Sequence, residues 1–159
     1  MKSKKKKKLN WRAGGILTVL VTVICFYLSF SPSISVHVGS NLNQFDPFQT
    51  TFILRNNYWL FTITNIQRTY SGNHFVFSDG SEIHARTMVV PDAIISSIGS
   101  QKEYTFLLNM NLLLPTNSIS SAETTIDIAY DIWFITMHDS FKFKVFKNSA
   151  GVFEWSPMS

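Results

Sequence analysis

The chain has 159 residues, with 14 basic and 10 acidic side chains and a formal net charge of +4. Seven of the basic residues precede residue 13, so the other seven face all ten acidic residues and leave a net charge of −3 on the rest. The basic pI of 9.3 therefore reflects a short N-terminal segment, and it does not indicate a nucleic-acid-binding surface. The single cysteine, Cys25, excludes an intrachain disulfide framework.

A lysine run and an apolar run stand side by side at the N-terminus. Lys4–Lys8 is followed by eighteen uncharged residues at 13–30, which as a helix cover about 27 Å, close to a bilayer core of about 30 Å. The positive-inside rule keeps such a basic flank in the cytoplasm. We therefore expect a basic cytoplasmic tail at 1–12, a transmembrane signal anchor at 13–31 and a periplasmic or extracellular domain at 32–159.

A cleavable signal peptide is the main alternative for this N-terminal region, since a basic segment before an apolar stretch describes both. Ser29 and Ser31 form a small-x-small pattern, but Pro32 follows directly and disfavours cleavage. The apolar run is also longer than the roughly 7 to 15 residues usual for such a peptide. These features favour an uncleaved anchor in the cytoplasmic membrane.

Apolar and polar side chains alternate along most of the remaining chain, which is typical of β-strands. In chain order, these segments are 34–38, 48–54, 60–66, a hairpin over 75–77 and 83 onward, 104–112, 126–134, 141–145 and 152–155. Asp79-Gly80 predicts a tight turn in the hairpin, because glycine accepts positive φ cheaply. A helical turn is expected only over Asp92–Ile98.

The absence of helical patterns between these segments predicts an all-β fold after one N-terminal transmembrane helix. We expect an antiparallel β-sandwich of seven to eight strands, with a closed barrel as the structural alternative. The fourteen phenylalanines then fill the core between two sheets.

Several stretches carry a resemblance to a known group of proteins. They are Ser31–Val36, Asp46–Phe48, Asn56-Asn57, Leu60–Ile66 and Trp155–Pro157. Together they resemble small bacterial single-pass membrane-anchored proteins of unknown function, whose external domain is similar to the immunoglobulin-like sandwiches of fibronectin type III and late-embryogenesis-abundant type 2 proteins. The resemblance implies an immunoglobulin-like fold and a membrane location, and it brings no catalytic or binding residues.

No catalytic, cofactor or metal site is predicted from the motifs. The histidines at 37, 74, 84 and 138 form no HxH or HxxxH pair, the spacings that place two imidazoles on one face of a strand or helix. No GxSxG motif occurs, and Cys25 lies in the apolar run, so no nucleophile has an evident base. Asp127 and Asp131 share one strand face, which we interpret as a solvated surface.

Tyr58 and Trp59 are the candidate partner-binding residues. They follow two asparagines at a predicted loop, and exposed aromatic side chains often anchor a protein partner. The sequence thus favours a non-enzymatic interaction or assembly protein of the cell envelope, in contact with the bilayer through 13–31 and with an envelope protein. One alternative is an envelope hydrolase or metal-dependent enzyme with a site assembled from scattered residues, namely Asp127, Asp131, His84 and His138. Another is a subunit of a secretion or conjugation apparatus.

Overall fold

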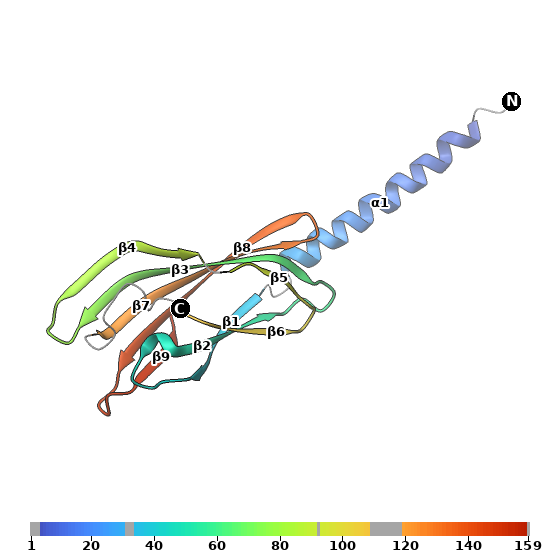
Figure 1. The fold of residues 1–159 in the computed structure, drawn as a ribbon. Helices are drawn as coiled ribbons and strands as arrows, with labels where there is room; N and C mark the ends of the chain where they lie inside the picture. The colour runs from blue at the N-terminus through green and yellow to red at the C-terminus, as the bar shows by residue number, and fades with distance from the viewer. Residues whose placement is uncertain (1–3, 31–33, 92, 109–118, 159) are drawn as a thin grey trace. The chain divides into compact units, whose positions relative to one another are not determined.

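A computed structural model gives the backbone of residues 4–30, 34–91, 93–108 and 119–158 (Figure 1). Side chains are described for 14–27, 34–84, 93–108 and 119–158. The chain divides into two compact units, Met1–Ser33 and Ile34–Ser159. The expected boundary between N-terminal segment and β-domain, at 31/32, lies within two residues of this division.

The first unit contains one helix, α1, from Lys4 to Phe30. Within the part of the chain whose side chains are described, no helix is long and apolar enough to cross a membrane. In α1 that part covers residues 14–27, which is shorter than the roughly 20 apolar residues that a span requires. The transmembrane span expected over 13–31 is therefore not supported by the described residues.

The second unit consists of two antiparallel β-sheets, so the all-β sandwich is confirmed. The smaller sheet contains β1 (Ile34–Asn41), β2 (Thr50–Asn56) and β6 (Glu103–Leu107), in the order β1-β2-β6. The larger sheet contains β4 (Glu82–Pro91), β3 (Ile63–Phe77), β7 (Ile119–Ile132), β8 (Ile135–Lys147) and β9 (Phe153–Pro157), in that spatial order. The ninth strand, β5 (Ile95–Ile98), pairs with the start of β3.

The described residues hold nine strands, where seven to eight were expected, and they differ from the expected segments in two places. Residues 60–66 and 75–77 were expected in separate strands, but from Ile63 onward they belong to the single strand β3, whose register shifts interrupt the alternation. The helical turn expected over Asp92–Ile98 is instead strand β5, which pairs with β3; Asp92 itself lies outside the described residues.

The core between the sheets is aromatic, as the phenylalanine content predicts. Phe52 of β2 is fully buried, and its ring centroid lies 6.0 Å from that of Phe106, 5.1 Å from Phe143 and 5.4 Å from Trp155. The contacts with Phe143 and Trp155 are edge-on, a favourable aromatic geometry. Phe52 therefore joins the smaller sheet to β8 and β9.

Strand β9 also closes one side of the domain through two hydrogen bonds to distant residues. The indole N–H of Trp155 donates to the Pro47 carbonyl at 2.8 Å, and the backbone N–H of Phe153 donates to the Gln44 carbonyl at 2.9 Å. Pro47 begins the short 3₁₀ helix η1 (Pro47–Gln49), which leads into β2. The segments expected at 141–145 and 152–155 belong to β8 and β9, which pair as a terminal hairpin.

Candidate functional site

Asn56, at the end of β2, organises the loop that carries the candidate residues. Its buried side-chain amide Nδ2 donates to the carbonyls of Phe61 (2.8 Å), Ile98 (3.1 Å) and Gly99 (3.1 Å). Its Oδ1 accepts the backbone N–H of Tyr58 at 3.0 Å. One side chain thereby joins β2, the loop after it and the turn after β5, since a buried amide is stable only when its polar groups are satisfied.

Tyr58 does not lie on the surface, which corrects the expectation for this residue. The bond from its backbone N–H to Asn56 turns the chain so that the Tyr58 ring is fully buried, 6.3 Å from the ring of Phe61. Its hydroxyl oxygen lies 3.5 Å from that of Tyr130, which donates to Asp139 Oδ2 at 2.9 Å. Burial, with the hydrogen bond to Tyr58, raises the pKa of Tyr130, so the Tyr130 phenol is a neutral group in the core.

Trp59, the second candidate residue, belongs to a group of exposed apolar side chains at one end of the sandwich. The exposed fractions are 65% for Trp59, 58% for Leu60, 59% for Trp133 and 86% for Phe134. These four residues, here called the end cluster, come from the loop between β2 and β3 and from the turn between β7 and β8. The two segments meet where the rings of Phe61 and Trp133 pack edge-on, 5.1 Å apart.

The turn between β7 and β8 has an unusual backbone. Ile132 and Ile135 pair directly, so Trp133 and Phe134 form a two-residue hairpin turn, and Trp133 has φ of 56°. Such turns need positive φ and normally use glycine or asparagine. A bulky side chain held in this conformation costs about 1–3 kcal/mol, and strain of this kind is concentrated at functional sites.

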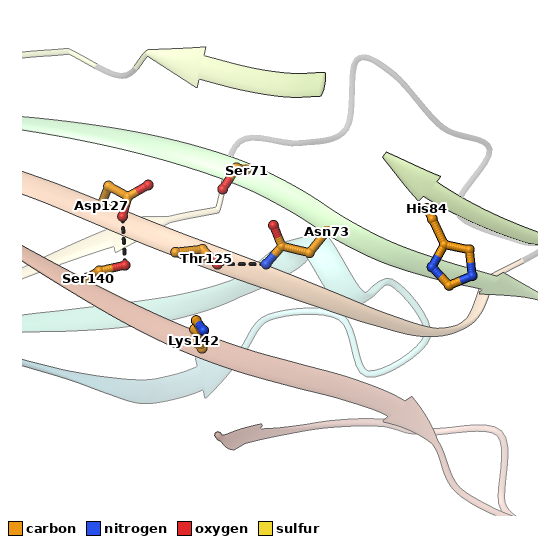
Figure 2. A pocket seen from close by; sticks show the side chains of 7 residues that line it. All are labelled: Ser71, Asn73, His84, Thr125, Asp127, Ser140 and Lys142. Atoms are coloured by element: carbon orange, nitrogen blue, oxygen red, sulfur yellow. Dashed lines mark hydrogen bonds between the residues drawn. The ribbon is translucent and has the colours of Figure 1, made fainter. Parts of the chain in front are cut away.

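The outer face of the larger sheet is polar and hollowed. An open groove of about 520 Å³ is lined by Ser71, Asn73, His84, Thr125, Asp127, Ser140 and Lys142 (Figure 2). Ser140 Oγ donates to Asp127 Oδ1 at 2.7 Å, and Asn73 Nδ2 donates to Thr125 Oγ1 at 2.6 Å. In Figure 2, His84 lies at the far end of the groove from the Asp127–Ser140 pair, an arrangement that gives Ser140 no imidazole base in the groove.

The other residues proposed for a scattered enzyme site have separate partners. Asp131 accepts hydrogen bonds from Asn65 Nδ2 at 2.8 Å and Thr136 Oγ1 at 2.7 Å. These bonds hold the pKa of Asp131 below its ordinary value, and the bond from Asn65 has the largest effect. The lowered pKa favours a permanent carboxylate over a general acid. Among the described residues, the only close group of three metal-ligating side chains contains neither aspartate nor His138.

That group consists of His74, Glu82 and His84 on the β3–β4 hairpin. Glu82 Oε2 lies 3.1 Å from His74 Nε2 and 3.3 Å from His84 Nε2. The two imidazole rings are stacked, with centroids 4.2 Å apart and an interplanar angle of 9°. The ligand atoms of all three side chains lie within 4.8 Å of one another.

A search for histidine spacings along one strand could not find this group, because its members face each other across two strands. The sequence feature that could have revealed the group is the β3–β4 hairpin. Its turn pairs Phe77 with Ser81 through the bond from Phe77 N to Ser81 O, 2.9 Å, and counting outward from that pair places His74 opposite His84, as the register confirms. Residues two apart on β4, Glu82 and His84, then share the face of His74.

No protein-family model, curated protein or solved structure matches this chain. The similarity to membrane-anchored bacterial proteins with an immunoglobulin-like external domain therefore stays a prediction.

Proposed function

We propose that the chain is a membrane-anchored, non-enzymatic interaction or assembly protein of the cell envelope, and that it binds a partner protein through the end cluster. The observation that carries this proposal is the exposure of Trp59, Trp133 and Phe134 at one end of the domain. Aromatic side chains, tryptophan above all, dominate the binding energy of protein interfaces. Clusters of exposed apolar side chains on a folded domain mark such interfaces.

The strained turn adds a second, independent argument. The positive φ of Trp133 costs stability, whereas glycine would adopt the same conformation without strain. The conformation presents Phe134 to solvent and leaves the Trp133 ring packed on one edge against Phe61. A bound partner that covers these rings would offset the strain energy of the Trp133 backbone, which nothing offsets in the isolated domain.

The strand order supports an immunoglobulin-like sandwich. One sheet has the order β1-β2-β6 and the other begins β4-β3-β7-β8. If β1 to β4 are taken as strands A, B, C and C′, and β6 to β8 as E, F and G, these orders correspond to A-B-E and C′-C-F-G, as in immunoglobulin-type domains with an added C′ strand. In such domains the loops at one end commonly form the binding surface, and the end cluster occupies such an end.

The proposed anchor is α1, and its side chains support a lipid environment. Its exposed large apolar residues are Ile16, Leu17, Val19, Leu20, Val21, Val23 and Phe26. At 100° per residue they cover roughly 220° of the helix circumference, which is wider than the stripe of roughly 100° on a helix that packs on one face only. Thr18 Oγ1 donates to the Gly14 carbonyl at 3.0 Å, and Thr22 Oγ1 to the Thr18 carbonyl at 2.9 Å, so neither hydroxyl enters lipid unsatisfied.

The preceding lysine run places the N-terminus of the proposed anchor in the cytoplasm. A reporter enzyme that is active only outside the cytoplasm should therefore be active when fused after Ser159. Activity of a cytoplasm-specific reporter at the same position would overturn the orientation.

Photo-crosslinking tests the proposed interaction surface. A photoreactive phenylalanine analogue replaces Phe134 in the full chain, and membranes of the native host are irradiated. Phe45 is the matched control, because it is also exposed, at 59%. It follows the last residue of β1, whereas the first residue of β1, Ile34, pairs with Asn56 beside the loop that carries Trp59. We expect a discrete protein adduct from position 134 and none from position 45. Absence of an adduct at 134, or the same adducts at both positions, would contradict the proposal.

A further inference from the structure

We propose that His74, Glu82 and His84 form a binding site for a divalent transition-metal ion, with Zn²⁺ as the best fit. The site lies on the β3–β4 hairpin and uses none of the four residues of the end cluster. It goes beyond the proposed interaction function, because an ion here would cross-link two strands and would leave a coordination position open.

The fold brings the three ligands together through the register of the hairpin. His74 pairs with His84, and Val76 pairs with Glu82, so His84 and Glu82 occupy alternate positions on one face of β4. Against β7, a register shift between Gly72 and His74 inserts one extra residue into β3 and keeps His74 on the outer face. Such bulges re-aim side chains and are frequent beside functional sites.

The distances match those of a tetrahedral zinc site. With Zn–N and Zn–O bonds of about 2.0–2.1 Å, two ligand atoms of a tetrahedron lie about 3.3 Å apart. The two distances from Glu82 Oε2 to the histidine Nε2 atoms, 3.1 and 3.3 Å, are close to this value. The parallel rings require a rotation of one imidazole before both lone pairs converge, and His84, whose side chain is 73% exposed, has the freedom to make it.

The donor set also selects the class of ion. Two imidazole nitrogens and one carboxylate oxygen suit zinc, copper or nickel, whereas magnesium and calcium prefer oxygen ligands alone. The same His₂Glu set with a fourth position open to water occurs in catalytic zinc sites. Side-chain exposures of 26% for His74 and 49% for Glu82 leave the group accessible from solvent.

A nearby acidic residue, Glu123, has a cationic partner of its own. Glu123 of β7 pairs with His74 in the sheet, and its carboxylate is held by Lys144 Nζ at 3.1 Å. The alternative role for the trio is a solvent-exposed ion pair that only stabilises the hairpin weakly and binds no metal.

Calorimetry on the full chain tests the site. The protein is purified in detergent without a polyhistidine tag, stripped with a chelator and titrated with ZnCl₂. We expect one ion per chain and at least tenfold weaker binding for His84→Ala and for Glu82→Gln. His138→Ala removes an exposed histidine outside the group and should leave binding unchanged. Cobalt substitution provides a second readout, since tetrahedral Co²⁺ absorbs visible light far more strongly than octahedral Co²⁺.

These measurements distinguish a metal site from a simple ion pair, and the test does not fail through misfolding of a variant. His84 and Glu82 are exposed, so their variants should unfold at nearly the wild-type temperature when metal is absent. No zinc binding by the wild-type chain would overturn the proposal. Equal binding by the wild-type, His84→Ala and Glu82→Gln chains would also overturn it, because the ion would then sit elsewhere.

Discussion

Replacing Asn56 by aspartate tests whether this side chain holds the end of the domain together. Asn56→Asp keeps the size of the side chain but removes the amide N–H groups that serve the carbonyls of Phe61, Ile98 and Gly99. A carboxylate in their place would face carbonyl oxygens in a buried site. A carboxylic acid would retain one donor and could still accept the N–H of Tyr58.

The magnitude of the effect depends on pH, and its sign follows from the protonation states. Burial and the facing carbonyls favour the neutral acid, so the folded pKa of the new side chain lies above its unfolded value of about 3.9. Between these two pKa values the folded state binds more protons, and stability falls by about 1.4 kcal/mol per pH unit as pH rises. The lost amide hydrogen bonds add about 1–3 kcal/mol at every pH.

Thermal unfolding followed by circular dichroism between pH 4.5 and 7.5 measures how the stability of the Asn56→Asp chain depends on pH. Asn57→Asp is the matched control, because Asn57 is the next residue and is half-buried. Among the residues whose side chains are described, its Nδ2 bonds only the Ser35 hydroxyl, at 3.1 Å. Relative to the wild type, the Asn56→Asp chain should lose stability steeply as pH rises, and the Asn57→Asp chain should change little. Parallel pH profiles for the two variants would refute the role assigned to Asn56.

Three further predictions concern the core, a close strand contact and a surface carboxylate. Phe52→Ala should lower the free energy of unfolding by about 3–5 kcal/mol in denaturant titration, whereas Phe45→Ala at an exposed site should change it by less than about 0.5 kcal/mol. Gly39→Ala should cost about 1–3 kcal/mol in the same assay, since a Cβ there would lie 3.0 Å from a backbone oxygen of β2. Asn65→Gly should raise the pKa of Asp131 in an NMR titration, because it removes the main hydrogen bond that lowers this pKa and tolerates the positive φ of residue 65. The stability that this bond supports is present above the unfolded pKa of the carboxyl group and is lost as pH falls through the folded one.

Strand alternation predicted much of the buried face of the larger sheet. Ile126, Ile128, Tyr130 and Ile132 are buried as their period-two pattern requires. The same pattern continues to Phe134 and would place that ring in the core, yet it is the most exposed large apolar side chain described. The two-residue turn that interrupts the strand has no glycine or asparagine, so the sequence carried no turn signal at this point.

Parts of the candidate site depend on interactions that local patterns do not encode. Tyr58 is buried because a side-chain acceptor two residues earlier turns the backbone, and Trp59, its neighbour, is exposed for the same reason. The histidine group depends on pairing between strands and on a bulge beside His74. Alternation describes a regular strand, and a bulge reverses which residues face the core.

The attachment of β9 to the segment before β2 has a consequence for biosynthesis. The bonds from Trp155 to Pro47 and from Phe153 to Gln44 span more than a hundred residues, and the Trp155 ring covers Phe52. The strands of the smaller sheet are therefore synthesised long before β9, which packs against them. Folding that depends on such distant contacts is slow. Nascent chains that still lack β9 leave the aromatic side chains around Phe52 accessible to chaperones. The domain can therefore complete its folding only after nearly all of it has been translated.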